Sequence, residues 1–198
     1  MSDNRYIKAV AASTPSAVGA TLMKTGQTTS YRTGDDGDTE AGRATSFTVL
    51  ASNNPFGNTN RFTDELGGQT YTNNIVIDWS TYDGATVLGF RRGLLGPSNW
   101  NTAIDACLAI SVAPFTSGWR LPNITELHNV MNFETSTYAW ENAPLNINDL
   151  IWTSTTKKSA TNRAYTTVTA GIWGERDKSL TQKYLPCRTF TVTGTTLS

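Results

Sequence analysis

Side chains that commonly carry out catalysis are scarce in this sequence, which has one histidine, His128, and two cysteines, Cys107 and Cys187. A hydrolytic triad needs a base beside its nucleophile, and a histidine-based metal site needs a second histidine, which the chain lacks. The carboxylates are scattered among loop residues, and no phosphate-binding or dinucleotide-binding glycine pattern occurs. We therefore expect no enzymatic activity, no catalytic residue, no metal site and no cofactor.

Residues suited to recognition gather in two places. The segment 171–178 combines an aromatic residue with four charges between two expected strands, and its candidate ligand-binding residues are Trp173, Glu175, Arg176 and Asp177. Trp and Arg favour recognition because they offer a large rigid surface and forked hydrogen-bond donors. The second place is a loop with Tyr138 and Trp140. In the alternative interpretation, Trp173 packs into the core and the charges form a solvated hairpin tip.

An acidic run near the N-terminus raises the question of calcium binding, since this cation takes several carboxylate oxygens from short loops. The run consists of Asp35, Asp36, Asp38 and Glu40. It lacks the rest of an EF-hand loop, notably the glutamate at the twelfth position. We favour a solvated turn over a calcium site there, because acidic turns are common.

The charge balance excludes several classes of partner. The 198 residues include 16 Lys and Arg and 16 Asp and Glu, so the formal net charge is zero. A nucleic-acid-binding surface requires a basic stripe and an anionic membrane attracts polybasic segments, and the sequence has neither. No apolar stretch approaches the length of a membrane span, and no secretory leader is visible at the N-terminus. We expect a protein made in a cytoplasm, with release by host lysis inside a virus particle as one route out.

Two strands and a helix are predicted in the middle of the chain. The strands are 75–79 and 86–91, and the turn signal Asp83-Gly84 between them indicates a hairpin. A helix is predicted to start at 96–98 and to end near Ile110. Its apolar residues recur at helical spacing: Trp100, Ala103, Ile104, Cys107 and Leu108.

A second helix is predicted from Asn123 to about Asn132. Asn123 is a good N-cap, and Glu126 three positions later is able to complete a capping box. The core-facing stripe contains Ile124, Leu127, Val130 and Met131. His128 lies off that stripe and is predicted to be a surface residue, and Arg120 is predicted to pair with a local carboxylate or with carbonyl groups.

The last fifty residues indicate strands at 150–155, 163–169 and 184–192, with a return or tip at 172–176. Pro186 inside the last strand costs a ladder hydrogen bond and indicates an edge or a bulge. The whole chain therefore has an α+β pattern. We expect a turn-rich arm or attachment segment over 1–45 and a single globular domain over 46–198.

This series of motifs resembles the Lcl C-terminal domain family over about residues 60–198. The resemblance rests on the helix ending in Cys107, on Trp119-Arg120-Leu121-Pro122 followed by Glu126-Leu127, on Trp152–Thr155 and on Tyr184 with Cys187-Arg188. It departs from the family pattern at Thr153, at Pro186 and over 75–92. The resemblance implies a C-type-lectin-like fold, with two helices against antiparallel strands and long loops. It also implies that Cys107 and Cys187 are neighbours, bonded or not, whereas two independent buried thiols are the alternative.

The resemblance extends to bacteriophage-encoded members and directs the functional hypotheses. The first is a non-enzymatic virion protein whose lectin-like domain attaches to a glycan or protein on the host surface. The alternatives are a purely structural head-decoration or fibre protein, or a bacterial cell-surface adhesin. In the virion setting, the arm at 1–45 would contact other virion proteins, and the chain would form a homo-oligomer.

Overall fold

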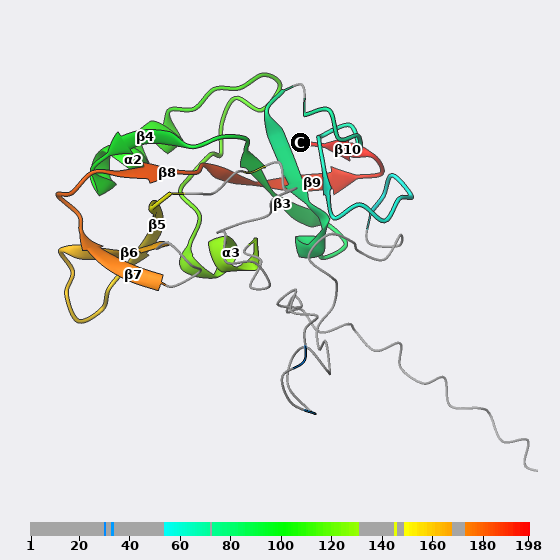
Figure 1. The fold of residues 1–198 in the computed structure, drawn as a ribbon. Helices are drawn as coiled ribbons and strands as arrows, with labels where there is room; N and C mark the ends of the chain where they lie inside the picture. Colours follow the sequence, from blue (N-terminus) through cyan, green and yellow to red (C-terminus); the bar gives the residue numbers. More distant parts are fainter. Residues whose placement is uncertain are drawn as a thin grey trace, which may run out of the picture.

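The computed structural model describes residues 30, 33, 54–71, 73–130, 145, 149–167 and 173–198. Within these residues the fold is mixed α+β, with two five-stranded sheets and two α-helices, as the pattern predicted (Figure 1). The elements in chain order are β1 (Phe62–Thr63), β2 (Ile75–Asp78), the 3-10 turn η2 (Trp79–Thr81), β3 (Thr86–Arg91), β4 (Leu95–Ser98), α2 (Trp100–Leu108), α3 (Ile124–Asn129), β5 (Ile151–Thr156), β6 (Arg163–Thr167), β7 (Trp173–Asp177), β8 (Gln182–Tyr184), β9 (Cys187–Thr193) and β10 (Thr196–Leu197).

The first sheet has the strand order β1-β2-β3-β9-β10, and all of its pairs are antiparallel. The predicted hairpin of β2 and β3 is present, with Asp78 opposite Leu88. Strand β3 then pairs with β9, which follows it by about a hundred residues, in a register that sets Leu88 opposite Thr189 and Gly89 opposite Arg188. Because side chains alternate along a strand, Leu88 and Thr189 share one face of this sheet, and Arg188 lies on the other.

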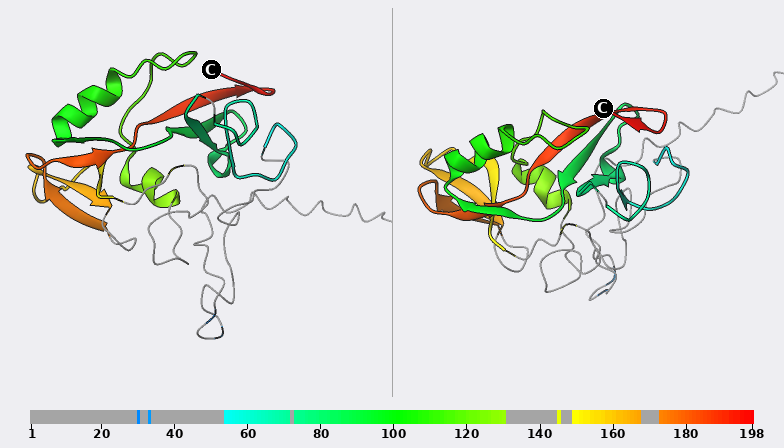
Figure 2. Two further views of the ribbon diagram at one scale, coloured as in Figure 1. Left: turned by 45° about the horizontal axis from the view of Figure 1, so that its top comes forward. Right: turned by 90° about the horizontal axis from the view of Figure 1, so that it is seen from above.

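The second sheet has the order β4-β8-β5-β6-β7 and is antiparallel except for the parallel pair β5 and β8. The predicted single strand over 184–192 is two strands, because the chain passes from the second sheet to the first between Tyr184 and Cys187. Pro186 stands in this break, where its carbonyl accepts a hydrogen bond from the N–H of Arg91. Figure 2 shows β8 and β9 as one long path that joins the two sheets.

Helix α2 begins at Trp100, later than the predicted start, because Gly96 and Pro97 belong to β4. Asn99 caps the helix by accepting a hydrogen bond from the N–H of Thr102. The buried face contains Ala103 and Cys107, and the helix ends at Leu108 rather than near Ile110.

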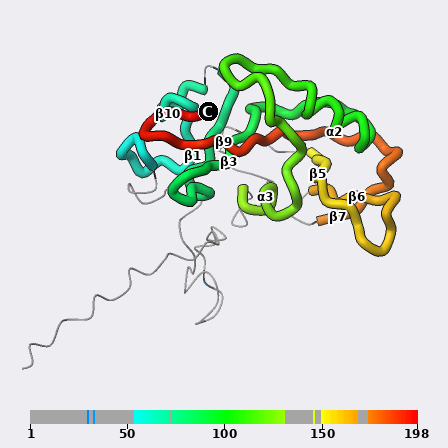
Figure 3. The backbone as a smooth tube through the Cα atoms, turned by 180° about the vertical axis from the view of Figure 1, so that it is seen from behind, coloured from blue at the N-terminus to red at the C-terminus, as the bar shows by residue number. Residues whose placement is uncertain are grey.

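Helix α3 lies between the two sheets (Figure 3). The predicted capping box is present: Asn123 Oδ1 accepts from the N–H of Glu126, and Glu126 Oε2 accepts from the N–H of Asn123, both at 2.8 Å. Leu127 and Val130 are fully buried. The helix ends at Asn129, and Met131 and the following residues of the predicted helix lie outside the described residues.

A buried ion pair joins the first sheet to α3. The Arg61 guanidinium donates to both carboxylate oxygens of Asp78, at 2.7 and 2.8 Å, and both side chains are almost fully buried. Arg61 Nη2 also donates to the carbonyl of Asn129 at 2.6 Å. The pair therefore fixes the C-terminal end of α3 against the strands.

Several predictions fall on residues that the structure does not describe. Apart from Ser30 and Thr33, the arm at 1–45 is among them, and so is the acidic run Asp35–Glu40. The boundary between arm and domain and the choice between calcium and a solvated turn therefore stay predictions. Among the described residues, no helix has the length and apolar character needed to cross a membrane.

Candidate functional site

The segment predicted to be a return or a tip between two strands is itself a strand. Residues Trp173–Asp177 form β7, the edge strand of the second sheet, and they pair with β6 from Thr167 opposite Trp173 to Arg163 opposite Asp177. Of the two alternatives, the return is therefore correct over 173–177, since Glu175, Arg176 and Asp177 each take a ladder position opposite β6. The charged side chains are consequently held along a sheet edge.

The candidate binding residue Trp173 is half-buried. It packs against the core cluster that includes Leu127 and Val130. Its ring centroid lies 5.8 Å from that of His128, with the two planes tilted by 36°. His128 is exposed, as predicted, and the partial burial of its imidazole lowers its pKa. Trp173 thus contributes to packing beside α3.

Internal bonds occupy two of the charged residues of β7. Glu175 forms an ion pair with Lys157 and accepts a longer contact from Arg163 at 3.6 Å, and the hydrogen bond from Lys157 lowers the pKa of this carboxyl. Asp177 accepts hydrogen bonds from the backbone and hydroxyl of Ser179, which lower its pKa. Neither a hydrogen bond nor an ion pair of the Arg176 side chain is found within the described part of the chain.

The remaining predicted residues are a loop pair and two cysteines. Tyr138 and Trp140 lie outside the described residues. Cys107 on α2 and Cys187 at the start of β9 are both buried and free. Burial raises the pKa of the Cys107 thiol to about 12, and burial also raises that of Cys187, where the Arg120 guanidinium opposes it only in part. Arg120 forms a two-pronged ion pair with Glu126, as predicted, and donates to the Cys187 sulfur at 3.3 Å.

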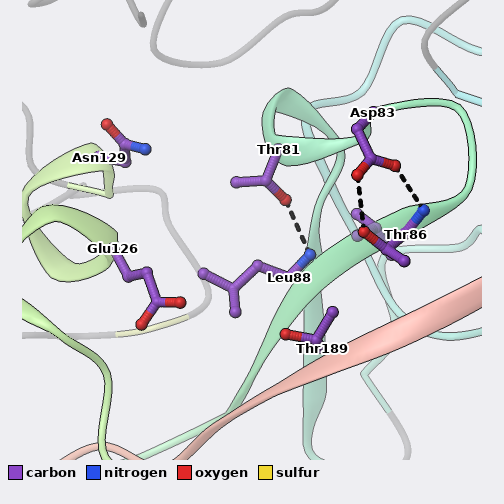
Figure 4. Close-up of a pocket in the computed structure, with 8 residues that line it drawn as sticks. Thr81, Asp83, Thr86, Leu88, Glu126, Asn129 and Thr189 are labelled. Atoms are coloured by element: carbon purple, nitrogen blue, oxygen red, sulfur yellow. Dashed lines mark hydrogen bonds between the residues drawn. The ribbon is translucent and has the colours of Figure 1, made fainter. Parts of the chain in front are cut away.

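A groove of about 330 Å³ lies between the first sheet and α3, at a place that none of the predicted site residues occupies. Figure 4 shows Glu126 and Asn129 of α3 on one side and residues of η2, β3 and the turn between them on the other, with Thr189 of β9 below. The lining residues are Thr81, Asp83, Thr86, Val87, Leu88, Glu126, Asn129 and Thr189.

The wall formed by the turn is rigid because its polar groups are bonded within it. Asp83 accepts hydrogen bonds from the N–H groups of Ala85 and Thr86 and from the Thr86 hydroxyl, and these bonds lower the pKa of its carboxyl. The Thr81 hydroxyl accepts from the N–H of Leu88 at 2.8 Å. The turn and the strand therefore hold one another in place.

The α3 wall and the floor of the groove carry polar side chains that are able to form further hydrogen bonds. Within the described residues, neither the Asn129 carboxamide nor the Thr189 hydroxyl has a protein partner. Glu126 is engaged by Arg120 and by the N–H of Asn123, yet each carboxylate oxygen accepts more than one hydrogen bond. The groove thus combines hydroxyl, amide and carboxylate groups with the apolar surface of Leu88.

This lining suits binding through hydrogen bonds better than it suits bond cleavage. It contains no histidine, cysteine or lysine, and the Asp83 carboxylate is already committed to its own turn. No group of three or more His, Cys, Asp or Glu side chains placed to hold a metal ion is found among the described residues. A neutral polar ligand, with hydroxyl or amide groups, matches the donors and acceptors of the groove.

Sequence reasoning missed the groove because its walls come from segments about forty residues apart. The turn signal at Asp83 and the capping pair of Asn123 and Glu126 were both recognised from the sequence, but as local structural features. Only the contact of α3 with the sheet brings these segments together. No protein-family model matches the chain, and a search of curated proteins finds no match.

Proposed function

We propose that this protein is a non-enzymatic binding protein with a C-type-lectin-like domain, which attaches a bacteriophage particle to a glycan or protein on the host surface. The groove between β3, β9 and α3 is the observation on which the binding function rests. It offers hydroxyl, amide and carboxylate groups on a scaffold held by the buried pair of Arg61 and Asp78. A few polar groups placed beside apolar surface are typical of ligand-binding sites, and hydroxyl, amide and carboxylate groups are able to form hydrogen bonds with the hydroxyls of a glycan.

The order of the elements supports the lectin-like fold. A strand, two helices and a set of mostly antiparallel strands follow one another, and β3 pairs with the late strand β9. The motifs that resemble the Lcl C-terminal domain family lie on these same elements: Cys107 on α2, Trp119–Leu127 leading into α3, and Cys187 on β9. The virion setting rests on the resemblance of the ending Cys187–Phe190 to phage-encoded members of that family.

The binding function is tested by filling the groove. Thr189→Arg places a long side chain at its floor, and Thr193→Arg is a matched control on the same strand and face, at another exposed threonine outside the lining. On a glycan array and on intact host cells, we expect the wild type and Thr193→Arg to bind and Thr189→Arg to lose at least about tenfold in affinity. Equal binding by the two variants would place recognition elsewhere.

A structural role in the virion is the second candidate function, and the internal bonds of the charged residues in β7 favour it. Glu175 forms an ion pair with Lys157, and Asp177 accepts hydrogen bonds from Ser179 and Asn162, so these carboxylates stabilise the sheet edge and are not free to bind a ligand. If the wild-type protein binds neither glycans nor host cells but is found on intact particles, the structural role is supported and the binding role is not. A protein absent from virions and secreted by a bacterium would exclude both virion roles.

A further inference from the structure

Arg188 is held in an unusual position on the face of the first sheet opposite the groove. Its guanidinium carbon lies 5.1 Å from the ring centroid of Phe115 and 4.9 Å from that of Phe190. The two rings are 4.8 Å apart and nearly perpendicular, at 85°. Because the faces of aromatic rings attract cations, the two rings form a corner that fixes the guanidinium.

The donors of this guanidinium have no protein partner within the described residues. Three other arginines differ in this respect, since Arg61, Arg120 and Arg163 each contact a carboxylate. Burial lowers the pKa of Arg188, and among the described residues no carboxylate forms an ion pair with it. A rigid, partly desolvated guanidinium with free donors pairs strongly with an anion that reaches it.

The loop between α2 and α3 forms the second side of this position. Gly118 has a φ of +81°, and a Cβ on it would lie only 3.2 Å from Arg188 Nε, so the loop backbone passes directly beside the side chain. Thr116 and Ser117 precede Gly118, and both are exposed. Phe115 is anchored in turn, since its carbonyl accepts from the Trp119 indole N–H at 2.9 Å.

We propose that Arg188 and the loop Phe115–Gly118 form a binding site for an oxyanion, such as a sulfate or phosphate group. The guanidinium fork matches two oxygens of such a group, and the exposed hydroxyls of Thr116 and Ser117 lie in the adjoining loop to donate to a third. The site lies on the opposite face of β9 from Thr189, so it does not depend on the proposed role of the groove.

The test is an NMR titration of the full-length protein with sodium sulfate at constant ionic strength, which removes general screening effects. In the wild type, we expect saturable shifts of the Arg188 Nε–H signal and of the amides of Thr116–Gly118. Arg188→Lys keeps the charge but loses the fork, and it should weaken sulfate binding by at least about tenfold, since charge-assisted bidentate pairs are the strong ones. Arg188→Met keeps the apolar stem and should abolish the binding.

Arg92→Gln is the matched control, because Arg92 also lies over an aromatic ring, that of Tyr71, at 5.3 Å, but among the described residues lacks the second ring that Arg188 has. This variant should bind sulfate as the wild type does. A sulfated disaccharide compared with its unsulfated form separates a glycan-borne group from a free ion, and only the sulfated form should shift Arg188. Unchanged affinity in folded Arg188→Lys and Arg188→Met would overturn the proposal. Non-saturating shifts of equal size at Arg92 and Arg188 would also overturn it, since they indicate an adventitious ion only.

Discussion

The buried pair of Arg61 and Asp78 allows the sharpest prediction about stability. Asp78→Asn keeps the size of the side chain and removes its charge, so Arg61 loses its ion pair with this residue. The carboxylate accepts two bonds from Arg61, at 2.7 and 2.8 Å, and two from the backbone and hydroxyl of Ser80. Arg61 also donates to the carbonyl of Asn129, and the substitution should therefore loosen the end of α3 as well.

The contacts of Asp78 set the size of the expected loss in the free energy of unfolding. Each charge-assisted hydrogen bond contributes about 1.5–3 kcal/mol, and two of them join Arg61 to Asp78. Removing one partner of a buried ion pair costs about 3–5 kcal/mol, because the other charge stays buried without compensation. We therefore expect Asp78→Asn to lower the free energy of unfolding by about 3–5 kcal/mol.

Equilibrium unfolding in urea measures this loss, and a double-mutant cycle assigns it to the pair. Arg61→Met alone should cost a similar amount, while the double variant Arg61→Met/Asp78→Asn should cost much less than the two single variants together, because neither member of the ion pair remains charged. Glu126→Gln is the control on a half-exposed pair, and it should cost about 1 kcal/mol or less. A loss below about 1 kcal/mol for Asp78→Asn, or additive losses in the cycle, would refute the reasoning.

Three further measurements test other parts of the structure. Asn123→Ala removes the capping box of α3 and should lower the free energy of unfolding in urea by about 1 kcal/mol, while Thr125→Ala on the same helix should change it little. Burial would raise the pKa of Asp64, but four hydrogen bonds outweigh it and lower the pKa below the ordinary 3.8. The stabilisation from the Asp64 carboxylate is therefore complete above the ordinary pKa of 3.8 and is lost as the pH falls through the lower pKa of the folded state. Asp64→Asn should consequently reduce the dependence of the free energy of unfolding on pH between about pH 2 and 5. Cys107, with a pKa of about 12, should be thiolate in only about one molecule in ten thousand at about pH 8, so it and Cys187 should react with a thiol reagent only after unfolding. Rapid reaction of either thiol in the native protein would contradict their burial.

Local signals in the sequence were reliable where the chain itself supplies both partners. The capping box needs only Asn123 and Glu126, three residues apart, and it is present as predicted. The hairpin of β2 and β3 needs only the turn at Asp83, and Pro186, predicted to mark an edge or a bulge, instead stands in the break between β8 and β9. In each case the residue type restricts its own backbone or bonds to a near neighbour.

Features that depend on distant partners were not predictable in the same way. Arg61 precedes Asp78 by 17 residues and Asn129 by 68, and nothing in the spacing indicates that these groups meet. Glu175 and Asp177 of β7 looked available for a ligand, yet Lys157 and Asn162 contact them in the folded chain. The candidate groove arises in the same way, since the turn at Asp83 and helix α3 meet only in the folded chain.

The two proposed ligand surfaces are separate because they lie on opposite faces of one strand. Thr189 and Arg188 are adjacent on β9, and alternation along the strand sends the first toward α3 and the second toward Phe115. Gly89 makes this arrangement possible, since a Cβ there would lie 2.6 Å from Phe190 and would displace one of the rings that hold Arg188. The pairing of β3 with β9 therefore supports both surfaces at once, and damage to that pairing should affect the groove and the Arg188 site together.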